Sequence, residues 1–177
     1  MDQKTEAEIV ARVLKGDRHA YALLVEEYKS PIYNLAYRMT GNSADADDLT
    51  QETFIRAYKY LWRYDSQRKF FTWLYTISFN IIKSHIKKNK MNAKQISEKD
   101  ILSLDQNNLS PEARLIEDQE ISSLMLLVPE KIRILLIMKY HQEFSFEEIA
   151  QITGQSVSAI KMSIYRGLDL LKKMIKD

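Results

Sequence analysis

The chain has 177 residues, 45% of them apolar and 28% charged, a balance typical of a folded protein and far from that of a disordered one. It contains no cysteine, which excludes disulfides, thiolate chemistry and Cys-type metal sites. No apolar run approaches the roughly 18 residues of a membrane span, and the N-terminus lacks a signal-peptide pattern, so we expect a soluble, cytoplasmic protein. The net charge of +2 identifies no partner, but Lys83, Lys87, Lys88, Lys90 and Lys94 form a basic segment without an acidic residue.

Apolar residues follow helical spacing from Thr5 to Lys90, with breaks near 16–17, 41–43 and 65–69, which predicts four helices. The periodicity is then lost for about 20 residues, a length that favours a linker between two domains. It resumes after Ser110-Pro111-Glu112, a typical helix start. We therefore predict an all-α chain of two small helical domains, residues 1–92 and 113–177, joined by a flexible linker at 93–112.

The helix expected to begin at Ser43, a candidate N-cap, has two different faces. One is an apolar stripe made of Phe54, Ala57, Tyr58 and Leu61. The opposite face is polar and mainly acidic, and it contains Asp45, Asp48, Gln51, Glu52 and Arg56. Acidic residues can simply complement a helix N-terminus, but a patch set apart from the lysines suits a protein partner. The glycine and final glutamate of an EF-hand are absent, so this pattern predicts no metal.

The helix expected from Phe70 combines a buried stripe with a polar edge. The stripe consists of Phe70, Leu74, Ile77 and Ile81. The edge consists of Trp73, Thr76, Asn80, Lys83 and Lys87. Aromatic rings stack on unpaired bases and lysines follow phosphates, so this edge indicates single-stranded nucleic acid. The alternative is that Trp73 and Phe79 are core residues and that the lysines form a solvated helix end.

Residues 145–166 follow the pattern of a helix-turn-helix. Ser145 and Glu148 form a capping box, Gly154 ends the first helix, and Ile160 and Ile164 form the seam of the second. A second helix of this kind lies in the major groove of DNA. Its outward residues are Ser156, Ser158, Ala159, Lys161, Met162, Tyr165 and Arg166, the last suited to a phosphate. The alternative is an ordinary helical hairpin in which the serines are caps and the cations are solvated.

Together, the segments 35–42, 45–58 and 70–75, with Asn80, resemble region 2 of the extracytoplasmic-function (ECF) sigma factors. Val128-Pro129, Arg133 and residues 144–166 are similar to their region 4. The resemblance spans nearly the whole chain, with both modules in the family's order. The chain departs from the family pattern at Thr76 and Ser84, where Arg and Asp are usual, and at 159–163 in the recognition helix. These departures leave the −10 and −35 sequences undetermined.

The resemblance implies a bacterial initiation factor that binds core RNA polymerase and promoter DNA. It implies that the acidic helix face docks on the clamp helices of the β′ subunit and that the C-terminal module rests on the β flap. It assigns the opened −10 element to Lys69, Phe70, Thr72, Trp73, Thr76, Asn80, Lys83, Lys87 and Lys88. It assigns the −35 duplex to the outward residues of the second helix, between 156 and 166. A membrane-anchored anti-sigma factor is implied by the resemblance alone.

We therefore expect a sigma factor that is not an enzyme and uses neither cofactor nor metal. One alternative is a stand-alone helix-turn-helix transcription regulator, which would bind duplex DNA as a dimer without polymerase. Another is a metal-dependent nuclease that uses Asp45, Asp47 and Asp48. Their spacing turns these carboxylates to different helix faces, and the three histidines are scattered along the chain, which argues against a nuclease.

Overall fold

A computed structural model describes residues 1–97 and 124–176, and every regular element in these ranges is a helix. This confirms the all-α prediction. In chain order the elements are α1 (Gln3–Leu14), η1 (Arg18–Ala20), α2 (Tyr21–Thr40), α3 (Ser43–Lys59), η2 (Leu61–Arg63), α4 (Phe70–Ser97), α6 (Glu130–Tyr140), α7 (Phe146–Thr153) and α8 (Val157–Lys176). No helix in the described ranges has the length and apolarity needed to cross a membrane.

The breaks between the first helices lie where the sequence indicated them. Gly16 and Gly41 both adopt positive φ, and Gly41 ends α2 in the left-handed conformation that glycine takes without strain. The expected N-cap of α3 was wrong, because Asn42 and not Ser43 caps this helix. The Asn42 side chain accepts the Asp45 backbone N–H at 3.0 Å. Both residue types are good caps, so local propensity could not separate two neighbouring candidates.

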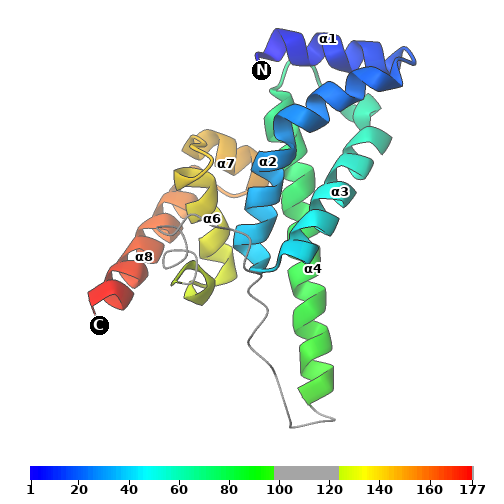
Figure 1. The fold of residues 1–177 in the computed structure, drawn as a ribbon. Helices are drawn as coiled ribbons and strands as arrows, with labels where there is room; N and C mark the ends of the chain where they lie inside the picture. The colour runs from blue at the N-terminus through cyan, green and yellow to red at the C-terminus, as the bar shows by residue number, and fades with distance from the viewer. Residues whose placement is uncertain (98–123, 177) are drawn as a thin grey trace.

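Helices α2, α3 and α4 form the N-terminal bundle, and α1 lies across one end of it (Figure 1). Its core contains the predicted α4 residues Phe70, Leu74 and Ile81, all buried, whereas Ile77 is half-buried. On α3 the predicted stripe is buried at Phe54 and Ala57, but 41% of Tyr58 is exposed. Helix α4 also continues past the domain boundary expected at residue 92. The predicted linker lies mostly outside the described residues.

Helices α6, α7 and α8 form the C-terminal module, with the predicted turn between α7 and α8. The capping box is confirmed, since Ser145 and Glu148 exchange bonds of 2.9 and 3.1 Å, and Gly154 ends α7 with φ 70°. Ile160 and Ile164 are buried as expected. At Gly167, α8 approaches α6 so closely that a Cβ atom would lie 2.5 Å from Ile132 Cγ2.

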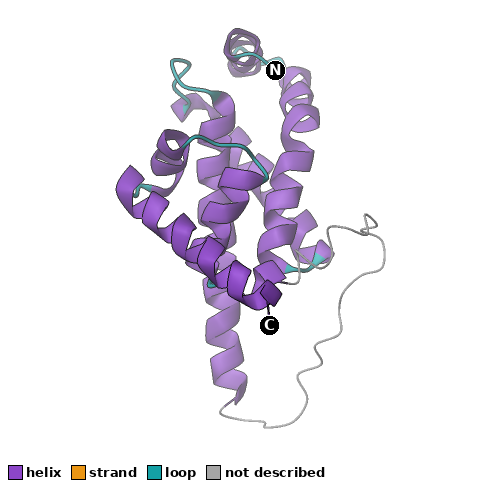
Figure 2. Cartoon of the chain, turned by 90° about the vertical axis from the view of Figure 1, so that its left-hand side faces the viewer, coloured by secondary structure: helices purple, strands orange, loops and turns teal. Residues whose placement is uncertain are grey.

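The two modules are in direct contact, with α6 against α2 and α7 against α4 (Figures 1 and 2). Phe144, 3% exposed, contacts the rings of Phe71 and Tyr75 with centroid distances of 5.3 and 4.8 Å. The Arg133 guanidinium donates to the Met39 carbonyl at 3.0 Å, near the end of α2, where backbone carbonyls lack helical partners. Two domains joined by a linker were predicted, but this docked arrangement was not.

Candidate functional site

The polar side chains of α3 form one surface, but they differ in exposure and in whether another side chain already pairs with them. This acidic face consists of Asp45, Asp48, Gln51, Glu52 and Arg56. Asp45 is half-buried, and its Oδ2 lies 3.2 Å from His85 Nε2 on α4. Arg56 pairs with Glu52 one helical turn away. Asp48 and Gln51 are exposed and best placed to meet a partner, whereas Glu52 is exposed but already pairs with Arg56.

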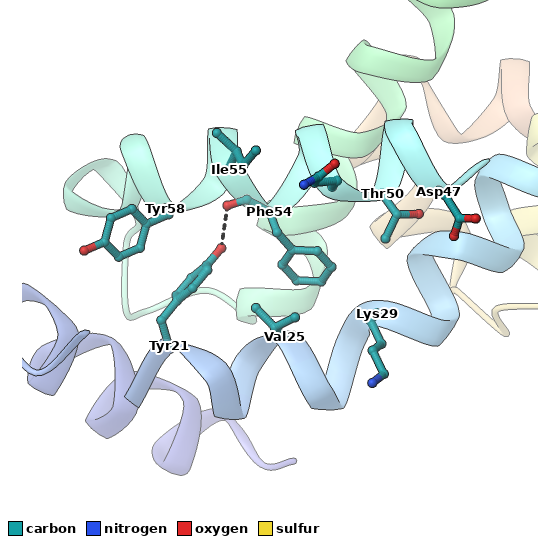
Figure 3. A pocket seen from close by; sticks show the side chains of 9 residues that line it. Tyr21, Val25, Lys29, Asp47, Thr50, Phe54, Ile55 and Tyr58 are labelled. Carbon is teal, nitrogen blue, oxygen red and sulfur yellow. Dashed lines mark hydrogen bonds between the residues drawn. The ribbon is translucent and has the colours of Figure 1, made fainter. Parts of the chain in front are cut away.

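An open apolar pocket of about 430 Å³ lies beside the acidic face, between α2 and α3 (Figure 3). It is lined by Tyr21, Val25, Lys29, Asp47, Thr50, Gln51, Phe54, Ile55 and Tyr58. The Tyr21 hydroxyl donates to the Phe54 carbonyl at 2.8 Å and so ties α2 to α3 at the pocket wall. Ile55 is 61% exposed at the rim. No sequence pattern predicted this pocket; the one signal was Ile55, an apolar residue outside the predicted stripe.

The residues expected to contact the −10 element form the α4 surface, and they are not equally accessible. Phe70 is fully buried and Thr72 is 8% exposed, so neither side chain can contact a DNA strand directly in this arrangement. Trp73 and Thr76 are half-buried. The exposed members are Lys69, Asn80, Lys83, Lys87 and Lys88. Three of the predicted features therefore lie along one solvent-facing edge: an indole ring, an amide and several ammonium groups.

Trp73 belongs to an aromatic cluster at the start of α4. Its ring centroid lies 5.5 Å from Phe70 and 5.6 Å from Tyr64, which fixes the indole in one orientation. Burial raises the pKa of Tyr64 to about 12, so its hydroxyl stays protonated and donates to the Arg68 carbonyl at 2.5 Å. This bond holds the loop that precedes α4. The cluster can therefore offer a half-exposed ring on a rigid support.

Lys69 stands at the junction of the two modules, where its Nζ lies 2.8 Å from Glu148 Oε1. The hydrogen bond that the Lys69 ammonium donates to Glu148 raises the pKa of Lys69. Burial acts to raise the pKa of Glu148, but bonds from Lys69 and Ser145 outweigh it and lower this pKa. One carboxylate thus caps α7 and engages a lysine of the α4 surface, so Lys69 is occupied while the modules are docked.

The first turns of α8 present a recognition surface, made of Ser156, Ser158, Ala159, Lys161, Met162, Tyr165 and Arg166. All seven side chains are exposed, as the sequence predicted. The Ser156 hydroxyl also accepts the Ala159 backbone N–H at 3.3 Å, so this serine caps the helix as well. Lys161 Nζ lies 5.2 Å from the Phe146 ring centroid. These residues surround the helix end that such folds insert into the major groove.

Comparison with known proteins identifies the family. The profile of Sigma-70 region 2 matches residues 24–91 and that of Sigma-70 region 4 matches residues 118–171. The chain is 35% identical, over 95% of both sequences, to the ECF RNA polymerase sigma factor SigW of Bacillus subtilis. It belongs to the ECF sigma factor family. The RNA polymerase sigma-H factor of Pseudomonas aeruginosa is 26% identical over 99% of this chain and 96% of its own sequence.

Two solved structures share the fold of this ECF sigma factor. One is the sigma factor RpoE of Bartonella quintana in complex with the anti-sigma factor NepR, with a TM-score of 0.73 and 20% identity over 88% of this chain and 96% of that one. The other is CnrH in complex with the cytosolic domain of CnrY, with the same TM-score and identity over 99% and 98% of the two chains. Both confirm the two-module helical architecture.

The nuclease alternative finds no support in the geometry of its three carboxylates. Asp45 faces His85, Asp47 lines the apolar pocket, and Asp48 is exposed on the acidic face. Within residues 1–97 and 124–176, no group of three or more His, Asp or Glu side chains could hold a metal ion. A stand-alone helix-turn-helix regulator would leave the region 2 module unexplained.

Proposed function

We propose that this ECF sigma factor binds core RNA polymerase through the acidic face, reads the −10 element as an opened strand with the α4 surface, and reads the −35 duplex with the recognition surface. The observation that carries the proposal is the separation of chemistries on one small module. Helix α3 exposes carboxylates, whereas α4 exposes lysines beside a supported indole. The first repels DNA and the second attracts it.

Polymerase docking would combine charge with an apolar anchor. The acidic face suits a basic helical surface such as the β′ clamp helices named by the family resemblance. The pocket beside it, with the exposed Ile55 at its rim, suits an apolar side chain of the same partner helix. Anchors of this kind usually supply most of the affinity of an interface, while the charges steer and orient it.

At the −10 element the α4 surface would hold bases that have left the stack. Unstacking costs a few kcal/mol per step, and stacking on an aromatic ring returns about 1 to 3 kcal/mol per base. Trp73 is the half-exposed ring available for this purpose, and Lys83, Lys87 and Lys88 would follow the phosphates. Polymerase contacts must supply the rest, so we expect the free chain to bind promoter DNA weakly.

At the −35 element the recognition surface offers few groups that can form paired bonds to a base edge, so phosphate contacts would carry much of the affinity. The β flap would support this module on the polymerase. An anti-sigma factor, membrane-anchored in the family pattern, is the expected inhibitor. The structures of RpoE with NepR and of CnrH with CnrY support this expectation by analogy of fold.

The decisive test is capture of purified core RNA polymerase by the wild-type chain and by an Asp48→Ala, Glu52→Ala double variant. We expect the variant to lose most of the binding. A Glu8→Ala, Asp169→Ala variant removes the same charge from exposed positions elsewhere and should bind like wild type. Equal binding by all three would reject the acidic face as the interface. No binding by the wild type, with dimeric binding to duplex DNA, would favour the stand-alone regulator.

A further inference from the structure

Glu6 of α1 is a buried carboxylate that belongs to none of the surfaces described above. It is 3% exposed and lies outside the segment 24–91 that matches region 2. Its Oε2 accepts the backbone N–H of Phe70 at 3.0 Å, and its Oε1 accepts the hydroxyl of Tyr28. One side chain thus joins α1 to α2 and to the first residue of α4.

The bond to Phe70 lies where a helix needs an external partner. The first N–H groups of a helix have no acceptor within it, and a negative charge there interacts favourably with the helix dipole. A buried carboxylate is costly unless hydrogen bonds hold it, so the two donors also fix the position of Glu6. Gln3 adds a second tie, since its Nε2 donates to the Ser66 carbonyl at 3.2 Å in the loop before α4.

The residue that Glu6 holds also supports the half-buried indole of Trp73. The Phe70 ring lies 5.5 Å from Trp73 and 5.4 Å from Tyr64, and Trp73 follows Phe70 by one helical turn. We propose that Glu6 is a positioning residue for capture of the opened strand. Its hydrogen bond to the Phe70 backbone sets how far the first turn of α4 is rotated about the helix axis and where it lies along that axis, and so determines the orientation of Trp73. This inference rests on the proposed reading of the opened −10 strand.

The test uses holoenzyme and forked DNA with a random-sequence single strand at the −10 position. The strands retained by each holoenzyme are sequenced, and core affinity is measured separately. We expect Glu6→Ala to reduce strand enrichment about tenfold, because the first turn of α4 loses the acceptor that holds it in place, with core affinity within about twofold of wild type. Glu6→Gln keeps an acceptor for Phe70 and should restore enrichment. Glu8→Ala, an exposed change on the same helix, is the matched control.

A spectroscopic measurement separates positioning from loss of fold. In a Trp62→Phe background Trp73 is the sole tryptophan, because the chain has two. Glu6→Ala should increase acrylamide quenching of Trp73 at a temperature where far-UV circular dichroism is unchanged, and Glu6→Gln should reverse the increase. Equal enrichment by Glu6→Ala and Glu8→Ala would overturn the inference, as would a parallel loss of core binding. Absence of strand selection by the wild type would instead reject the proposed −10 function, and the inference with it.

Discussion

The two tryptophans of the chain differ in what surrounds them, and this difference predicts different roles. Trp73 is half-buried in the cluster with Phe70 and Tyr64, whereas Trp62 is 65% exposed and covered on one side by Arg63, whose Cζ lies 4.7 Å from its ring. Trp73→Ala should weaken capture of a forked −10 strand by holoenzyme by about 1 to 3 kcal/mol per stacked base. Competition binding with a selected forked DNA measures the effect.

Trp62→Ala is the control for this prediction, because it also removes an indole ring, but from η2, which precedes α4. We expect it to change strand capture by less than a factor of about three. A larger loss from Trp62→Ala than from Trp73→Ala would show that the stacking ring had been assigned to the wrong tryptophan.

Glu148 makes the docking of the two modules sensitive to acid. Its pKa lies below the ordinary 4.5 while it is bound to Lys69 and Ser145. A lowered pKa means that the contact contributes above pH 4.5 and is lost as the pH falls through the lowered value. Small-angle scattering should therefore show wild-type chains expanding in this acidic range, with circular dichroism confirming that the helices persist.

Glu148→Gln is the matched variant, because glutamine preserves the capping box but removes the charge that pairs with Lys69. At neutral pH the variant should be slightly less compact, since a partly exposed ion pair contributes at most about 1 kcal/mol. Its compactness should not respond to the same acidic step. An identical response in both chains would mean that other carboxylates control the docking.

The sequence correctly predicted whether individual side chains are exposed or buried where helical periodicity alone determines it. All seven members of the recognition surface are exposed, and Ile160 and Ile164 are buried, because helical periodicity determines both. Periodicity also predicted that Phe70 is buried, whereas the resemblance placed Phe70 and Thr72 at the −10 strand; the structure buries both side chains. Tertiary contacts from α1 and α2 cover α4, and no pattern within α4 indicated the burial of Thr72.

Helix α8 contains an interior glycine whose role depends on its neighbour α6. In an isolated helix Gly→Ala stabilises by about 1 kcal/mol. At Gly167, however, the new methyl group would lie 2.5 Å from Ile132 Cγ2 and 3.0 Å from Leu136 Cδ1. Overpacking typically costs about 1 to 3 kcal/mol, so Gly167→Ala should lower the free energy of unfolding measured with urea.

Ala159→Gly provides the contrast, because Ala159 is exposed on the same helix and its change costs only helix propensity. Ile132→Ala combined with Gly167→Ala should recover part of the lost stability by making room for the methyl group. A stabilising Gly167→Ala would show that α6 and α8 can separate at no cost.

The helices of the N-terminal module were largely predictable, since three breaks rich in glycine, asparagine or charged residues separate strong apolar periodicities. The exact ends were less so. Asn42 replaced Ser43 as the cap of α3, and α4 continues to Ser97 beyond the expected boundary. The pocket between α2 and α3 was also not predicted, because it arises from the spacing of two helices and from Tyr21, which no sequence pattern singled out.

The contact between the modules could not be predicted, because it joins surfaces far apart in sequence. Phe144 lies between α6 and α7, yet it contacts Phe71 and Tyr75 of α4. The −10 and −35 elements lie about 52 Å apart along DNA if one and a half turns separate them. Because Lys69 contacts Glu148 of α7 and α7 packs on α4, the α4 surface and the helix-turn-helix lie close together here. On the function proposed above, the modules must therefore separate before both elements can be read together.

A covalent link across this contact tests the separation directly. The chain has no cysteine, so Lys90→Cys and Glu130→Cys, at an ion pair of 2.6 Å, give a single site for a short thiol-reactive cross-linker. The linked chain should still bind core polymerase through the acidic face but should not initiate at a promoter with both elements. A cleavable linker should restore initiation after reduction, and single-cysteine chains treated alike are the controls. Full initiation by the linked chain would contradict the requirement that the two modules separate.

On the proposed function, the burial of Phe144 would also influence how strongly the holoenzyme competes for a promoter. When only the separated form can engage both promoter elements, the apparent dissociation constant for the promoter is the intrinsic one divided by the separated fraction. Each 1.4 kcal/mol by which the Phe144 contact favours docking would therefore lower the apparent promoter affinity about tenfold. Substitutions at this ring, which touches no DNA or polymerase surface proposed above, would shift the holoenzyme concentration at which transcription begins.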